Sequence, residues 1–194
     1  MRSVRVNLRL GCVASACVAV AVALTLGACG NQIGDACGLS TDCSPEGGRI
    51  CDTAPSSNEG YCTIRGCDFG TCPEEAVCVR FFPVSQLMRD CDGQDDCTLD
   101  ETCSAGKCAP RASEVRYCML ACSGHGDCRG GYECRNDARA QLHGGEPVPD
   151  PLGGASVATA FCASAGECRT DDDCATSLGD TCDGDARFCA PSSF

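Results

Sequence analysis

The chain has 194 residues, a formal net charge of −12, 23 cysteines and no tryptophan. A surface this acidic, with Lys107 as its only lysine, excludes nucleic acid as a partner, because phosphate backbones are bound by clustered basic side chains. Cysteine above about 8–10% of a chain is typical of a disulfide scaffold, and three tyrosines with six phenylalanines are too few for a large aromatic core. We therefore expect disulfides to stabilise the fold.

Residues 1–28 have the layout of an export signal. The basic start consists of Arg2, Arg5 and Arg9. The stretch 10–26 carries no charged residue and is long enough to span a bilayer, but it lacks the dense Leu, Ile and Phe of most spanning helices. We expect a cleaved lipoprotein signal, with an uncleaved anchor and a plain secretory signal as the alternatives. Its removal leaves 12 basic and 27 acidic residues.

The signal ends in Leu26-Gly27-Ala28-Cys29, which resembles the lipobox of bacterial lipoprotein precursors: an aliphatic residue and two small residues before an invariant cysteine. The resemblance implies that the Cys29 thiol receives a diacylglycerol and that cleavage occurs just before it. Two or three acyl chains hold a protein firmly at a membrane. Gly30 replaces the Asp that resembles an inner-membrane retention signal in enteric bacteria, so we expect the outer membrane, with residues 29–36 as a short tether.

Residues 37–194 repeat one cysteine pattern in about five modules. A cysteine is followed by four or five residues, a second cysteine, five to seven residues and a third, and each module closes on a later cysteine. The first three cysteines of each module are Cys37, Cys43 and Cys51; Cys67, Cys72 and Cys78; Cys91, Cys97 and Cys103; Cys122, Cys128 and Cys134; and Cys168, Cys174 and Cys182. The residue before the second cysteine is Asp42, Thr71, Asp96, Asp127 or Asp173.

Cysteine counting is consistent with complete pairing. Without the signal and a lipidated Cys29, 20 cysteines remain, which is an even number. Four cysteines can pair in three ways, so the connectivity within a module stays open. Gly, Asp, Asn and Ser crowd the gaps between cysteines and favour turns. We predict a small disulfide-rich fold: a string of irregular loop and β-hairpin modules with little regular secondary structure.

Apolar residues often stand directly before a cysteine, and we expect each to form a miniature core beside its own disulfide. Examples are Tyr61, Val77, Tyr117, Phe161 and Phe188. Two segments depart from the repeat. The apolar segment 79–88 is either a packing cluster between modules or an exposed partner-binding patch. The Gly- and Pro-rich segment 135–161 is predicted to be a flexible insertion pinned at its base by cysteines.

The sequence offers few candidates for a metal site. Thiolate metal sites need spacing such as Cys-x2-Cys, which does not occur in this chain. Calcium binds several carboxylate oxygens, and the weak candidates are Asp90, Asp92, Asp95 and Asp96. This cluster faintly resembles the calcium-loading loops of thrombospondin type 3 repeats but lacks their regular run of acids. The alternative is a solvated acidic loop, and we expect no other cofactor.

Hydrolytic chemistry has equally little support. Nucleophilic catalysis needs a base beside Ser or Cys, and the only histidines are His125, between two glycines, and His143, in the predicted insertion. Neither position predicts a held geometry. Nucleophile-elbow, phosphate-loop and metalloprotease motifs are absent from the sequence. We therefore expect a protein that is not an enzyme.

The whole precursor resembles the cysteine-rich predicted lipoproteins of myxobacterial type, in which a lipobox precedes repeated acidic-Cys modules. The resemblance covers the anchor and all five modules, and it implies location and build more than activity. We expect a lipid-anchored envelope protein whose stapled modules contact an envelope protein or a glycan. The alternatives are a calcium-stabilised adhesion module and a protease-inhibitor-like protein.

Overall fold

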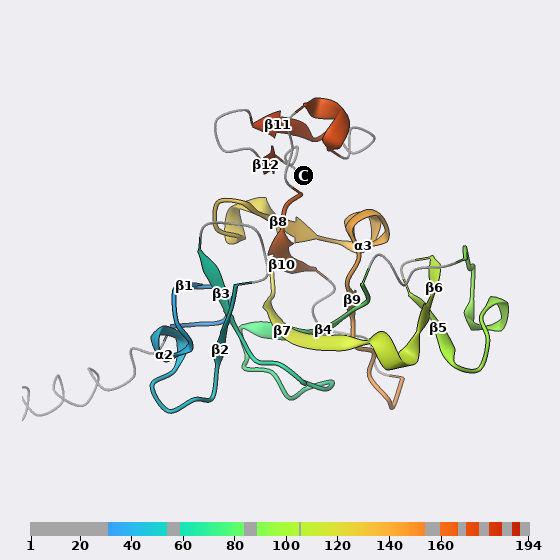
Figure 1. The fold of residues 1–194 in the computed structure, drawn as a ribbon, viewed down its shortest axis with the longest axis horizontal. Helices are drawn as coiled ribbons and strands as arrows, with labels where there is room; N and C mark the ends of the chain where they lie inside the picture. The colour runs from blue at the N-terminus through green and yellow to red at the C-terminus, as the bar shows by residue number, and fades with distance from the viewer. Residues whose placement is uncertain are drawn as a thin grey trace, which may run out of the picture. The chain divides into compact units, whose positions relative to one another are not determined.

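The computed structural model describes residues 31–53, 59–83, 89–104, 106–153, 160–166, 170–174, 179–183 and 188–190 (Figure 1). The predicted signal, Cys29 and the apolar residues 84–88 lie outside these ranges. The described chain consists of short strands and brief helical turns held by disulfides, which confirms the predicted small disulfide-rich fold. No helix in these ranges is long and apolar enough to cross a membrane.

Short antiparallel strands carry most of the regular structure (Figure 1). One sheet places β3 (Gly60–Thr63) between β1 (Ala36–Cys37) and β2 (Ile50–Asp52). Another places β4 (Ala76–Phe81) between β7 (Val115–Leu120) and β9 (Glu146–Pro147). Three further pairs are β5 (Glu101–Ser104) with β6 (Lys107–Pro110), β8 (Tyr132–Arg135) with β10 (Phe161–Ser164), and β11 (Thr181–Asp183) with β12 (Phe188–Ala190).

Disulfides cross within each module. The first cysteine bonds the third and the second bonds the fourth, in all four modules whose cysteines are fully described. The bridges are Cys37–Cys51, Cys43–Cys62, Cys67–Cys78, Cys72–Cys118, Cys91–Cys103, Cys97–Cys108, Cys122–Cys134, Cys128–Cys162 and, in the last module, Cys174–Cys189. The structure thereby selects one of the three pairings that the sequence left open.

The polar residue before the second cysteine closes the turn that leads into it. Its oxygen accepts hydrogen bonds from backbone N–H groups three or four residues earlier, at 2.7–3.2 Å. These turns include α2 (Ser40–Cys43), η2 (Gln94–Asp96) and η4 (His125–Asp127). The first N–H groups of a helical turn have no partner within it, so an acceptor at this position satisfies them. This explains the repeated acid and why Thr71 can replace it.

One hydrophobic core is shared by three modules. We call the following buried residues the shared core: Ile33, Tyr61, Cys67, Cys78, Val79, Cys118, Met119, Tyr132, Val148, Phe161 and Ala163. Tyr117, Val77 and Phe81 pack against it. The prediction of a separate miniature core at each disulfide is therefore wrong for Tyr61, Val77, Tyr117 and Phe161; the side chain of Phe188 lies outside the described residues. Each module is too small to bury a face alone, so the apolar faces combine.

The apolar segment that begins at Val79 contributes to packing. Val79 is fully buried in the shared core, and the ring of Phe81 meets that of Phe161 edge-on at 6.0 Å between centroids. In the described chain a second, smaller cluster lies in the first module, and it consists of cysteines alone: Cys37, Cys43 and Cys62 with Cys51 against them. The described part of the segment thus favours the packing interpretation over the exposed patch.

The third module lies within the second along the chain. We call residues 89–110 the hairpin module; it contains η2, β5 and β6 and both of its own disulfides. It follows β4 and precedes β7, which pair with each other through six residues each, and Cys72 bonds Cys118 across it. The disulfide that closes the second module therefore spans the whole hairpin module in sequence. The 3₁₀ turn η3 (Arg111–Ser113) connects the two.

The segment 135–161 differs from the predicted flexible insertion. It contains α3 (Asp137–His143), whose N-cap Asn136 accepts a hydrogen bond from the Arg139 N–H at 3.2 Å. Strand β9 then pairs with β4, and Val148 is buried in the shared core. Gly145 has a φ of 89°, and a Cβ there would lie 2.7 Å from the Phe81 ring. Backbone capping and core contacts therefore order the described part of this segment, despite its Gly and Pro content.

The N-terminal tether is shorter than predicted. Ile33 is only 1% exposed and belongs to the shared core, and the Gly34 N–H donates to the Cys62 carbonyl at 2.9 Å. Residues 33–36, predicted to be tether, are part of the folded body. In sequence, only residues 30–32 separate Cys29 from Ile33.

Candidate functional site

The predicted calcium ligands do not converge. The Asp90 carboxylate pairs with Lys107, and the Asp96 carboxylate accepts a hydrogen bond from the Asp92 N–H at 2.8 Å. In the described chain, every group of three potential metal ligands whose atoms lie within 4.8 Å of one another consists of cysteines. Asp96 therefore holds the turn of its module, and Asp90, Asp92 and Asp95 form no shared oxygen cage with it.

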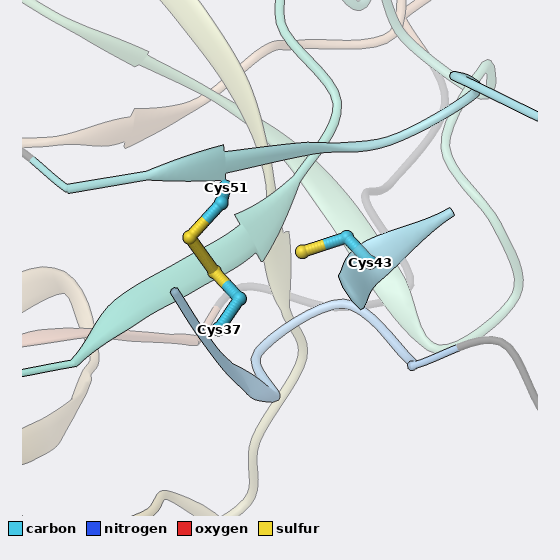
Figure 2. A group of neighbouring side chains, drawn as sticks. All are labelled: Cys37, Cys43 and Cys51. Atoms are coloured by element: carbon cyan, nitrogen blue, oxygen red, sulfur yellow. A yellow bond between two sulfur atoms is a disulfide. The ribbon is translucent and has the colours of Figure 1, made fainter. Parts of the chain in front are cut away.

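The cysteine groups are structural in the oxidised protein. Figure 2 shows Cys43 with its sulfur facing the bridge between Cys37 and Cys51. In each of the four groups, two sulfurs bond each other and the third bonds a cysteine outside the group. Metal binding by cysteine requires a thiolate, and a disulfide sulfur is not one. These groups therefore serve as staples.

Both histidines are held, contrary to the expectation from their loop positions. The His125 Nδ1 accepts a hydrogen bond from the Cys134 N–H at 3.0 Å, and burial lowers the pKa of His125. The His143 Nδ1 lies 2.5 Å from Glu133 Oε1. His125 thus contacts the main chain of β8, and His143 contacts a side chain of β8. These contacts tie both rings to the structure around β8.

A cavity of about 280 Å³ lies beside the shared core. Its lining combines aromatic and aliphatic side chains with a few polar ones from β2, β3, β4, β7, β8 and β10: Asp52, Tyr61, Thr63, Phe81, Tyr117, Met119, Tyr132, Arg135, Ala163 and Ser164. All three tyrosines of the chain are among them. A concave, mostly apolar site with a few polar groups is typical of a ligand pocket. This cavity is the candidate functional site.

The aromatic rings of the cavity hold one another in place. Tyr61 and Tyr132 stack with centroids 5.1 Å apart, and Phe81 lies tilted against Tyr117 at 6.4 Å. The Arg129 guanidinium covers the Tyr132 ring at 4.3 Å and donates to the Tyr132 hydroxyl at 2.7 Å. Such ring pairs and cation–π contacts add stabilisation beyond burial. The rings therefore form a fixed wall.

A buried charge cluster supports one edge of this wall. Arg139, 3% exposed, forms a two-bond pair with Asp180 at 2.6 Å for each bond and contacts Glu133 at 3.0 Å. The Arg135 Nε donates to Glu133 at 2.8 Å. Burial by itself raises the pKa of Glu133, but the hydrogen bond with His143 and the charge of Arg135 outweigh it and the pKa is lowered. Because buried charges need partners, this cluster joins α3 and β8 to the last module.

Arg135 connects the cluster to the cavity. Its guanidinium also donates to the carbonyls of His143, Gly144 and Ser164 at 2.8–2.9 Å, and it lines the cavity. Each of these bonds fixes the plane of the guanidinium. The charge cluster thus positions the one cationic group of the cavity lining.

Comparisons with protein families, with curated proteins and with solved structures find no match for this chain. The structure itself must therefore supply the argument for function.

Sequence reasoning identified none of the cavity residues as a site. Tyr61 and Tyr117 stood out only as residues before a cysteine, and Met119, Arg135 and Ser164 had no motif around them. One signal was available: each tyrosine stands one or two residues before a cysteine, on a strand that contains this cysteine. The lining residues come from strands that are far apart in sequence: Asp52 and Ser164 are 112 residues apart. No local sequence pattern indicates such a contact.

Proposed function

We propose that this chain is an envelope-anchored bacterial lipoprotein, attached through lipid on Cys29, whose disulfide-stapled body is a non-enzymatic interaction module. The observation that carries the proposal is the combination of an export signal ending in a lipobox with a body held by crossed disulfides. Disulfides persist in oxidising compartments outside the cytosol. The body therefore fits the destination to which the signal would send it.

The folded body adjoins the proposed anchor. Because Ile33 is buried, the body begins within a few residues of Cys29, and we propose that it sits close to the outer-membrane surface. Its acidity favours solubility over contact with anionic headgroups. We propose an envelope protein or a glycan as its partner, contacted from this rigid body.

The two alternatives have less support in the described residues. A calcium-stabilised module needs converging oxygens, whereas Asp90 and Asp96 have other partners. A protease-inhibitor-like protein needs an exposed loop; in the described part of the Gly- and Pro-rich segment 135–161, β9 pairs with β4 and Val148 is buried in the shared core. Isothermal titration of the oxidised protein with calcium tests the first of these directly, and a measurable heat of binding would restore it.

Anchoring is tested by expressing the full precursor in a Gram-negative bacterium and measuring its mass and its membrane partition. We expect a mature chain beginning at Cys29 with added acyl mass, and a mass increase of about 20 hydrogens on reduction, for ten disulfides from 20 cysteines. Cys29→Ser should release the protein from the membrane. Cys17→Ser, inside the signal, is the matched control and should leave the mature protein unchanged. Retention of the signal in the wild-type protein would overturn the proposal.

A further inference from the structure

The tyrosine-lined cavity is apolar because its polar atoms have internal partners. The Tyr61 hydroxyl accepts a hydrogen bond from the Leu120 N–H at 2.9 Å, and burial raises the pKa of this hydroxyl. The Tyr132 hydroxyl accepts one from Arg129, and the Thr63 hydroxyl donates to the Cys118 carbonyl at 2.7 Å. These side chains therefore present mainly carbon to the cavity.

The cavity cannot easily collapse. Tyr61, Tyr117 and Ala163 are each next to a cysteine whose bridge ties it to another strand or turn. The cavity is partly open to solvent, so these bridges, and not an enclosing core, keep the walls of the cavity apart. Its volume of about 280 Å³ is near the lower end of ligand pockets, roughly 300–1,000 Å³. A preformed space of this size suits a small molecule and spares the ordering cost of binding.

The charges at the cavity favour a neutral ligand. Arg135 already bonds Glu133 and three carbonyl oxygens, so it offers little to an anion, and the acidic chain repels one. Asp52, the one acidic residue in the lining, is engaged in an interaction within the protein. Within the described part of the chain, the Tyr117 hydroxyl has no hydrogen-bond partner. It can pair with one polar group of a ligand.

We propose that this cavity binds a small neutral molecule with an apolar ring and a single hydrogen-bonding group. The ring packs against Phe81, Met119 and the tyrosine rings, and the polar group meets Tyr117. This site is independent of the proposed anchoring through Cys29.

The protein contains its own reporter for this proposal. It has no tryptophan, and its three tyrosines all line the cavity, so tyrosine fluorescence reports on this site alone. The probe is cyclohexanol, which is neutral, has one hydroxyl on an apolar ring and does not fluoresce. The chain from residue 29 onward with Cys29→Ser carries neither the apolar signal nor the lipid, so it avoids detergent, which would compete for an apolar cavity. We expect a saturable fluorescence change with cyclohexanol and none with glucose, a ring of similar size bearing many hydroxyls.

Cavity-filling variants locate the binding. Ala163→Leu should fill the cavity and weaken cyclohexanol binding at least about tenfold, whereas Ala112→Leu adds the same atoms at an exposed position and should leave it unchanged. Tyr117→Phe should weaken binding about three- to tenfold through the lost hydrogen bond. If Ala163→Leu fails to form its disulfides, Ser164→Val narrows the same cavity from its half-buried margin and should also weaken binding.

Three results would overturn the proposal. The first is the absence of saturation with cyclohexanol up to its solubility. The second is saturation that the folded cavity-filling variant leaves unchanged. The third is tighter binding of glucose than of cyclohexanol, which would indicate a sugar site. None of these results bears on the anchoring proposal, because the lipid is absent from the chain being tested.

Discussion

The hairpin module and the shared core are stapled by the same crossed pairs of disulfides, yet they bury different groups. The shared core buries rings and aliphatic chains, with Phe161 and Val79 fully enclosed. The hairpin module contributes none of its residues to that core, and Leu99 is 97% exposed. The hairpin module has side-chain hydrogen bonds where the other modules have apolar packing. The Gln94 side chain donates to the Glu101 carbonyl at 2.9 Å and accepts from the Cys103 N–H at 3.2 Å.

This comparison shows that disulfides and apolar packing have different roles in this protein. Two bridges and a few side-chain to backbone hydrogen bonds suffice to shape a unit of about 20 residues, since each bridge restricts the unfolded chain. Apolar packing instead joins units, and where three units meet it leaves the cavity. The hairpin module should therefore unfold by itself, whereas damage to the shared core should reach several modules together.

The largest effect is expected from removing the bridge that spans the hairpin module. Cys72→Ala with Cys118→Ala opens a loop of sequence separation 46 and should lower the free energy of unfolding by about 4 kcal/mol, with a further loss because Cys118 is fully buried. Guanidinium unfolding followed by tyrosine fluorescence measures this. An unchanged midpoint would show that the shared core does not depend on the bridge.

Removing a bridge inside the hairpin module should have a smaller and local effect. Cys91→Ala with Cys103→Ala opens a loop of separation 12, which corresponds to about 3 kcal/mol of chain entropy. Because no tyrosine lies in the hairpin module, the fluorescence midpoint should stay in place. Hydrogen exchange within residues 89–110 should accelerate. Faster exchange throughout β4 and β7 as well would contradict the independence of this unit.

The acid that closes each turn should contribute less. Asp127→Ala removes the acceptor for the Ser123 and Gly124 N–H groups at 2.7 and 3.2 Å and should cost about 1 kcal/mol of stability. Asp127→Asn keeps an oxygen acceptor and should recover much of this loss. The exposed Asp95 is the matched control, and Asp95→Ala should have no measurable effect. Equal losses from the Asn and Ala variants would show that charge, not the acceptor, matters.

The smallest effect is expected from lowering the pH, which acts on the hairpin module through Glu101. Hydrogen bonds from the Thr98 N–H and hydroxyl, and from Arg89, lower the pKa of Glu101 below its ordinary value. A group with a lowered pKa in the folded state contributes stability that is present above its unfolded pKa and is lost as pH falls through the folded value. The hydrogen-exchange protection factors of residues 89–110, which are corrected for the pH dependence of intrinsic exchange, should therefore fall below about pH 4.5. Glu101→Gln should remove that dependence, and an unaltered acid response in this variant would contradict it.

Some of this architecture was predictable from the sequence because it is local. Cysteine spacing and turn residues indicated the modules and the disulfide-rich class, and the acids before the second cysteines marked a common turn. The helix α3 also left a signal, since Asn136 can cap its start and Gly144, with a φ of 79°, ends it. The abundance of Gly and Pro around it outweighed that signal.

The rest depends on contacts between residues distant in sequence. Identical spacings permit three pairings per module, and only the packed structure distinguishes them. The merger of modules into one core requires the second module to close across the hairpin module, from Cys72 to Cys118. Arg139 and Asp180, 41 residues apart, show no shared pattern. The cavity depends on all of these long-range contacts, so it could not be predicted from the sequence.

Crossed pairing also has a consequence for how the protein matures. Every bridge in the described chain skips at least one cysteine in sequence; Cys67–Cys78, for example, spans Cys72. If cysteines were oxidised in the order in which they emerge from a translocation channel, each would bond the next cysteine in sequence. None of these bonds is a bridge of the described structure. Native pairs must then arise by thiol–disulfide exchange, on a timescale of seconds to hours set by oxidant and isomerase. Yield of the native protein should therefore depend on disulfide isomerase activity more than on the supply of oxidant.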